Sequence, residues 1–150
     1  MKRASWLLHS CSIVLIFITS FISSENTSLS NDVLKQTNQF RRSKGLLPLV
    51  IREELNAIAQ KHSVNMAKGR TGFGHGGFAR RDALARQKIK DVHSFAENVA
   101  YGPTTGKEVV EKWKRSPGHR KNMLGRYKYI GIGTAKDRHG RIYYTQVFAG

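Results

Sequence analysis

Three side chains that can transfer a proton or bind a metal ion, His75, Glu97 and His119, lie in segments that favour accessible positions. His75 lies in a glycine-rich loop (residues 72–77), whose glycines permit tight backbone turns that let the imidazole project into a neighbouring site. Two imidazoles and one carboxylate could hold a divalent cation such as zinc, with water completing the coordination shell. Alternatively, both histidines could hydrogen-bond to Glu97 and hold the loop and a helix against its strand. We favour this hydrogen-bond network over a resident metal.

Glu97 lies in a stretch, residues 94–100, that has the character of a strand. If this stretch is extended, Glu97 shares one face with Phe95 and Val99, because successive side chains of a strand point to opposite faces. An ionised carboxylate buried without partners is strongly destabilising. We therefore expect hydrogen-bond donors, a cation or an open cleft beside Glu97.

Apolar periodicity and turn residues predict the elements that position these side chains. Four helices are expected after the first one, which Asn31 or Asp32 would cap and Gly45 would end. Ser116 is a natural N-cap for the last helix. The expected later helices cover residues 52–68, 79–89, 104–115 and 116–124, and the expected strands cover 94–100, 129–136 and 141–148. This mixed order indicates an α+β fold built in layers, in which His62 is a hydrogen-bonded residue of the core or its edge.

The first 24 residues have the pattern of a secretory signal peptide: a basic start, an apolar run and small residues at Ser23 and Ser24. An uncleaved membrane anchor is the disfavoured alternative, because the apolar run is short and interrupted. A polar segment (residues 25–31) and one folded domain (residues 32–150) without a transmembrane span would follow. Cys11 is the only cysteine, so the exported domain would depend on its apolar core rather than on disulfides.

The chain is strongly basic, with a formal net charge of +16. Loss of residues 1–24, which contain Lys2, Arg3 and no acidic residue, would leave +14. The basic residues are scattered and form no recognisable nucleic-acid module, so nucleic acid is disfavoured as a partner. We expect a secreted, extracytoplasmic monomer that binds an anionic envelope polymer, a glycan, a lipid or a protein. A merely solubilising surface is the alternative.

A series of short motifs resembles the CAP superfamily, also called SCP-like (cysteine-rich secretory, antigen 5 and pathogenesis-related proteins), in its cysteine-free bacterial form. They occur in family order over residues 33–148 and include Leu47-Pro48-Leu49, Gly74-His75, Ala96-Glu97-Asn98-Val99-Ala100, Trp113, Ser116-Pro117-Gly118-His119, Tyr129-Ile130-Gly131-Ile132-Gly133 and Tyr144-Thr145-Gln146-Val147-Phe148. The resemblance implies a three-layer α-β-α sandwich with a small, mainly antiparallel sheet. It also implies export from the cell and a cleft where histidine and glutamate side chains meet.

Many eukaryotic members of that superfamily present two histidines and two glutamates in the cleft. By resemblance, His75 and Glu97 match the first of each pair. Ser116 stands where the second glutamate would fall, and Tyr143 stands where the second histidine would fall. His119 belongs instead to the bacterial Ser-Pro-Gly-His motif. These departures argue against a four-ligand metal site.

The expected function is a non-catalytic binding module whose ligand-binding cleft is formed by His75, Glu97 and His119. The same three residues are the candidate ligands if a divalent cation such as zinc binds. The alternative is a hydrolase that uses a metal ion or the pair Ser116 and His119, or in which His75 with Glu97 activates water. However, helix capping already explains Ser116, and the chain has no G-x-S-x-G nucleophile elbow. We therefore assign no catalytic residue and expect no enzymatic activity.

Overall fold

A computed structural model of the chain describes residues 27–150. The expected signal peptide, the membrane-anchor alternative and Cys11 lie outside the described residues. Within residues 27–150, no helix combines the length and the apolar character needed to cross a bilayer.

The described chain begins in a helix over residues 27–42, the N-terminal helix. The elements that follow are β1 (Val50–Ile51), α2 (Glu53–Ala67), α3 (Phe78–Lys88), β2 (Phe95–Tyr101), α4 (Gly106–Arg115), α5 (Pro117–Met123), β3 (Tyr129–Lys136) and β4 (Ile142–Ala149). The strand that carries Glu97 and the C-terminal hairpin are thus where the sequence predicted them.

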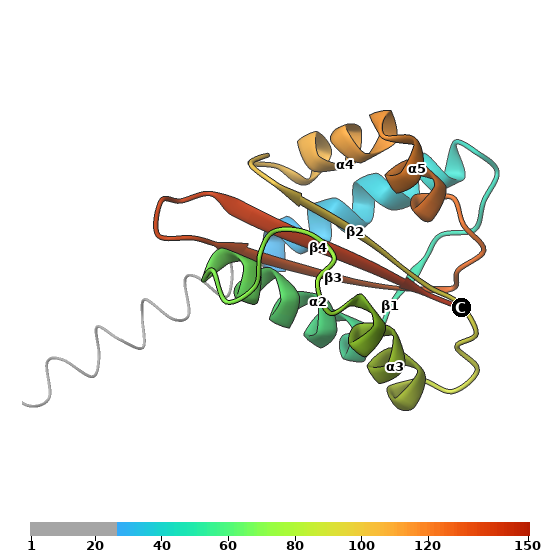
Figure 1. The fold of residues 1–150 in the computed structure, drawn as a ribbon. Coiled ribbons are helices and arrows are strands. Elements are labelled where there is room, and N and C mark those ends of the chain that lie inside the picture. The colour runs from blue at the N-terminus through green and yellow to red at the C-terminus, as the bar shows by residue number, and fades with distance from the viewer. Residues whose placement is uncertain (1–26) are drawn as a thin grey trace, which may run out of the picture.

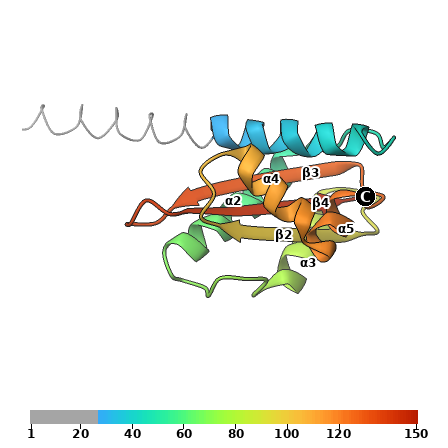
Figure 2. The same ribbon diagram turned by 90° about the horizontal axis from the view of Figure 1, so that it is seen from above.

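The four strands form one sheet in the order β1-β3-β4-β2. β1 pairs with β3 in parallel, whereas β3–β4 and β4–β2 pair antiparallel. Figures 1 and 2 show three layers, in which α2 and α3 cover one face of the sheet, and the N-terminal helix, α4 and α5 cover the other. The prediction of an α+β sandwich with a small, mainly antiparallel sheet is confirmed.

Each face of the sheet has its own apolar core, because the strands are buried on both sides. The core under the N-terminal helix, α4 and α5 is the larger one and includes Val33, Phe40, Val109, Val110, Trp113, Met123, Ile130, Tyr144 and Phe148. The core under α2 and α3 includes Leu55, Ile58, Ala59, Ala85, Ile89, Val92 and Val147. β2 lies between the two cores, so a polar side chain on either of its faces is buried and needs partners.

Two glycines of β3 let α2 pack directly on the sheet. A Cβ atom at Gly131 would collide with the backbone of Leu55, and one at Gly133 would collide with the backbone of Ala59. The Gly-x-Gly spacing therefore lines up with one turn of α2 and allows a close approach of helix and strand. This close packing fixes α2, and with it His62, against the sheet.

The structure corrects three details of the sequence-based prediction. Residues 27–31, expected as a polar segment before a helix cap, are helical, and the Asp32 carboxylate accepts hydrogen bonds from the Gln36 side chain and the Lys107 backbone. β1 was not predicted, because its two residues are too short to show an alternating pattern. Ser116 precedes α5 as expected, but its side chain makes no capping hydrogen bond.

Candidate functional site

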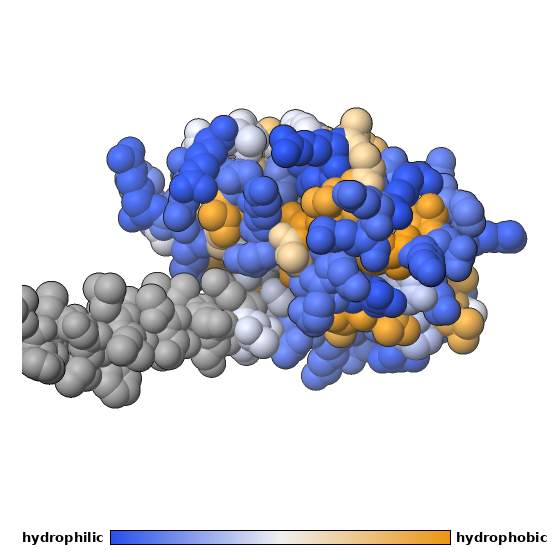
Figure 3. Space-filling view, turned by 90° about the horizontal axis from the view of Figure 1, so that it is seen from below, coloured by the Kyte–Doolittle hydropathy of each residue, from blue (hydrophilic) through white to orange (hydrophobic). Residues whose placement is uncertain are grey.

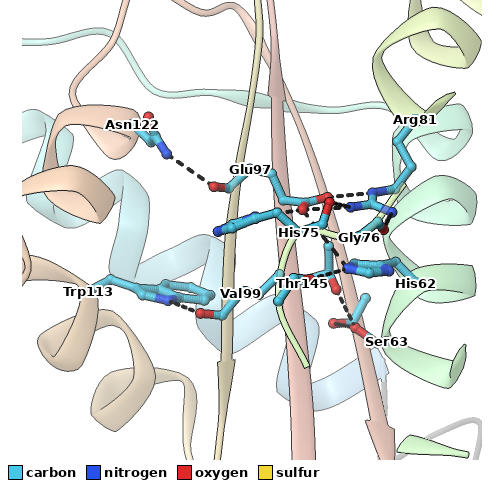
Figure 4. Close-up of polar contacts among 12 residues, drawn as sticks. His62, Ser63, His75, Gly76, Arg81, Glu97, Val99, Trp113, Asn122 and Thr145 are labelled. Atoms are coloured by element: carbon cyan, nitrogen blue, oxygen red, sulfur yellow. Dashed lines mark hydrogen bonds and ion pairs between the residues drawn. The ribbon is translucent and has the colours of Figure 1, made fainter. Parts of the chain in front are cut away.

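Glu97 is the buried centre of a charged cluster on the α2 and α3 side of β2. Its side chain is fully buried, and both of its carboxylate oxygens accept hydrogen bonds. His75 Nδ1 donates to Oε1 at 2.8 Å. Figure 4 shows His75, His62 and Arg81 converging on this carboxylate from the loop and from the two helices. The sequence argument that Glu97 must have partners thus has a concrete answer.

The strongest of these partners is Arg81, which the sequence analysis did not identify. Its Nε donates to Oε2 at 2.6 Å and its Nη2 donates to Oε1 at 2.8 Å, so the guanidinium grips the carboxylate with two parallel hydrogen bonds. Nη1 also donates to the backbone carbonyl of Gly76 at 2.8 Å. Arg81 therefore neutralises Glu97 and holds the glycine-rich loop at the same time. The sequence feature that could have revealed this partner is a cationic residue near the start of the helix that follows the glycine-rich loop.

His62 is the second partner that the sequence did not connect with Glu97. It is buried on α2, as predicted, and its Nε2 donates to the backbone carbonyl of Gly74 at 2.9 Å. The same nitrogen lies 4.0 Å from Glu97 Oε1. Burial lowers the pKa of His62, although the hydrogen bond to Gly74 and the charge of Glu97 act in the opposite direction. His62 thus supports the backbone next to His75.

His75 has the most exposed side chain of this cluster. Half of its side-chain surface is exposed (50%), while the Glu97 side chain is at 0%. Because Nδ1 is bonded to Glu97, the free Nε2 is the nitrogen available to a ligand. The imidazole of His75 is therefore oriented by the buried carboxylate of Glu97. That carboxylate is itself bound by Arg81, and the buried side chain of His62 lies near it.

The backbone of His119 lies beside Asn98, whose side chain points away from the carboxylate of Glu97. Within the part of the chain that the structure describes, no hydrogen bond or ion pair joins the two residues; the carbonyl of His119 instead accepts from Asn98 Nδ2 at 3.2 Å. Partial burial lowers the pKa of His119, and the positive charges of His75 and Lys112 act in the same direction. His119 is thus a neighbour of His75 but not a ligand of Glu97, which corrects the expected network.

The Asn98 face of β2 holds a second polar cluster, made of neutral amides. The Asn122 amide donates to Asn98 Oδ1 at 2.9 Å and to the backbone carbonyl of Glu97 at 3.1 Å. Asn98 also donates to Gln146, which in turn donates to Thr37 of the N-terminal helix. This amide cluster ties α5, β2, β4 and the N-terminal helix together. Apart from Asn98, no periodic pattern in the sequence identifies the residues of this cluster as partners of one another.

The alternative of a metal site formed by His75, Glu97 and His119 does not fit this arrangement. A divalent cation needs the lone pairs of Glu97, but the Arg81 guanidinium already contacts both carboxylate oxygens. Among residues 27–150, no three side chains of the types His, Cys, Asp and Glu are grouped so that they could hold a metal ion. A positively charged side chain thus occupies the place beside Glu97 that a cation would take.

A cavity of about 260 Å³ adjoins the charged cluster between α2, the glycine-rich loop and α3. Its lining includes the apolar side chains of Ile58 and Leu84, together with His62 and Arg81 of the charged cluster. Figure 3 looks onto this side of the molecule, where hydrophilic side chains predominate and hydrophobic ones show between them. The Thr71 residue also lines the cavity, and its buried hydroxyl has no hydrogen-bond partner among residues 27–150.

Comparison with known proteins places the charged cluster inside a family domain. The family model described as CAP, the cysteine-rich secretory protein family, matches residues 34–148. An uncharacterised protein of Bacillus subtilis (strain 168), YkwD, is 33% identical over 135 residues, which are 88% of this chain and 51% of that protein. The chain therefore spans about half the length of this curated relative.

Solved structures show the same fold. An extracellular protein with an SCP domain from Bacillus anthracis is 26% identical, with a TM-score of 0.71 over 83% of this chain and 41% of that one. A cysteine-rich secretory protein from Staphylococcus aureus has a TM-score of 0.67 over 83% of this chain and 39% of that one. At 24% identity, this second likeness supports the fold alone.

Proposed function

Because the chain belongs to the CAP family of cysteine-rich secretory proteins, we propose that it is a secreted, non-catalytic binding module. The proposed ligand is a component of the cell envelope, a glycan, a lipid or a protein, which contacts the surface around His75 and is attracted by the basic charge of the domain. Secretion is supported by the signal-like residues 1–24 and by the extracellular SCP-domain protein among the similar structures.

The observation that carries this proposal is that the charged cluster combines a buried carboxylate with an exposed imidazole. Glu97 is fully buried and bound by Arg81 through both oxygens, so its carboxylate is committed to holding the structure. His75 is half exposed, and its ring orientation is fixed by Glu97. A pre-oriented imidazole of this kind loses little conformational entropy when it forms a hydrogen bond to a ligand.

The same geometry gives little support to hydrolysis. A general acid or base has to exchange a proton with the substrate, and Glu97 has no exposed surface from which to do so, which leaves His75 as the member of the cluster that could act as a base. Ser116, the candidate nucleophile, makes no hydrogen bond to a histidine in the part of the chain that the structure describes. A nucleophile of this type requires an adjacent base. Recognition therefore accounts for the arrangement better than catalysis does.

The test is capture of envelope material by the immobilised domain. We expect wild type to retain a component from a detergent-free bacterial envelope fraction, and His75→Ala to lose most of that capture while remaining folded. The matched control is His93→Ala, since His93 is an exposed histidine outside the charged cluster. Equal capture by wild type and His75→Ala would contradict the proposal, and so would turnover of peptide, ester or glycan substrates that His75→Ala abolishes.

A further inference from the structure

A group of aromatic and cationic side chains lies next to His75 and is not explained by the fold. Only four large hydrophobic side chains are exposed among residues 27–150, and two of them, Phe73 and Tyr101, touch each other. Phe73 is 52% exposed and Tyr101 is 39% exposed. We call the following set the aromatic–cation patch: Phe73, Tyr101, Tyr143, Lys112 and Arg141.

The patch is assembled from four separate segments of the chain. Phe73 lies in the glycine-rich region before α3 and meets the Tyr101 ring edge-on, with the centroids 4.8 Å apart. Tyr101 ends β2 and stacks on Tyr143, its partner in β4, at 5.7 Å. Two cations lie over the Tyr101 ring, Lys112 of α4 at 5.6 Å and Arg141 of the hairpin at 5.3 Å. Packing from several directions thus fixes the position of Tyr101.

The patch is continuous with the surface around His75. Phe73 is two residues before His75, with Gly74 between them, and the backbone of Gly74 is held by His62. On the other side, Lys112 is close enough to His119 for its charge to affect that histidine. A ligand that touches His75 can therefore extend over Phe73 and Tyr101.

The chemistry of the patch favours one class of ligand. The C–H face of a pyranose ring packs well on an exposed aromatic ring, and a carboxylate on the sugar pairs with Lys or Arg. Insertion into a bilayer fits poorly, because burying Tyr101 would draw the charges of Lys112 and Arg141 towards the hydrocarbon. Single-stranded nucleic acid needs a series of free ring faces for successive bases, whereas here Tyr143 and two cations already cover Tyr101.

We propose that the aromatic–cation patch binds a carboxylated glycan, with a sugar ring resting on Phe73 and the edge of Tyr101 and a sugar carboxylate paired with Lys112 or Arg141. This inference rests on the proposed binding function and specifies its ligand class. The basic surface of the domain then serves to attract the polymer, and the patch distinguishes a sugar from other anions.

Calorimetric titration of the domain with oligogalacturonate, a carboxylated sugar chain, at physiological salt tests this proposal. We expect binding to wild type and an affinity lower by about three- to tenfold in Phe73→Ala, the range expected for loss of one aromatic contact. Leu47→Ala is the matched control, because Leu47 is an even more exposed apolar side chain (83%) outside the patch. Lys112→Gln should weaken binding more than Lys88→Gln, which removes the same charge from α3.

Four further ligands test the choice of a glycan. Neutral maltooligosaccharide should bind much more weakly than oligogalacturonate, and so should poly-L-glutamate of matched charge. If poly-L-glutamate, a single-stranded oligonucleotide or anionic phosphatidylglycerol vesicles bind as tightly, or if Phe73→Ala binds like wild type, the glycan proposal is wrong. Failure of oligogalacturonate binding alongside His75-dependent capture of envelope material would overturn this inference and leave the proposed function standing.

Discussion

Each face of β2 buries a polar side chain, and the two side chains are satisfied by different kinds of partner. Glu97 points towards α2 and α3, where it is bound by Arg81 and His75, and Asn98 points towards α5 and the N-terminal helix, where amides surround it. Both side chains are buried. The amide cluster is neutral, while the cluster around Glu97 is charged and reaches the surface through His75.

This difference separates a structural role from a recognition role. Amides can satisfy one another without a large desolvation cost, so the Asn98 face is suited to locking elements together. A buried ion pair is a less efficient way to stabilise a fold than apolar packing. The position of the Arg81–Glu97 pair beside a half-exposed imidazole is better explained if the pair serves to orient His75 for contact with a ligand. The predictions below test this contrast.

Glu97→Ala should have the largest effect on stability. It leaves the largely buried Arg81 guanidinium without its carboxylate, and removing one partner of such a pair costs about 3–5 kcal/mol in the free energy of unfolding. Urea denaturation followed by circular dichroism measures this change. Glu53→Ala, which removes an exposed carboxylate from the start of α2, should cost less than about 1 kcal/mol.

The pair itself can be isolated by a double-mutant cycle. Arg81→Met should also destabilise, because it strands the Glu97 carboxylate. The double variant Arg81→Met with Glu97→Met should be less destabilised than the sum of the two single variants, since no buried charge remains unpaired. Strict additivity would mean that Arg81 and Glu97 do not form the interaction seen in the structure.

Asn98→Ala should have a smaller effect, although Asn98 is as deeply buried as Glu97. Its loss leaves the amides of Asn122 and Gln146 with one partner fewer, and an unsatisfied buried polar group costs about 1–3 kcal/mol. The same denaturation experiment measures this loss. Gln87→Ala, which truncates an exposed amide on α3, should stay within about 0.5 kcal/mol of wild type. If Asn98→Ala proves costlier than Glu97→Ala, the contrast between the two faces is reversed.

The sequence revealed the elements of the fold better than the contacts of the site. Local patterns predicted β2, the C-terminal hairpin and α2, because alternation and helical spacing are properties of neighbouring residues. The requirement for partners around Glu97 was also predictable from the energetics of a buried charge. His75 was predicted as one of these partners and does donate to Glu97. Arg81 was not predictable, because it is the path of the glycine-rich loop into α3 that brings its guanidinium to the carboxylate. His119 was expected to contact Glu97, whereas in the described residues its backbone carbonyl accepts from Asn98.

His62→Gln should make stability less dependent on pH. Burial lowers the pKa of folded His62 below its unfolded value of 6.5, so the unfolded chain takes up the proton first on acidification. The stability that neutral His62 contributes is therefore full above about pH 6.5 and declines as the pH falls below it. Glutamine can still donate to Gly74 but does not titrate. Unfolding free energies measured between pH 7 and 5 should thus fall less steeply than in wild type.

His119 has the same sign of pKa shift and will retain part of the slope. His139→Gln, at an exposed position in the hairpin turn, is the matched control and should leave the profile unchanged. A wild-type profile that is flat over this range, or one that the His62 variant does not alter, would place His62 outside the coupled cluster.

His75→Ala should have the smallest effect on stability, and it gives the sharpest test of the contrast. Glu97 keeps both hydrogen bonds from Arg81 when the imidazole is removed, and a half-exposed contact between an imidazole and a carboxylate contributes less than about 1 kcal/mol. If the two faces of β2 differ as argued, this variant should unfold within about 1 kcal/mol of wild type and yet lose envelope capture. A large loss of stability would instead mean that His75 has a structural role, as Asn98 has on the other face of β2.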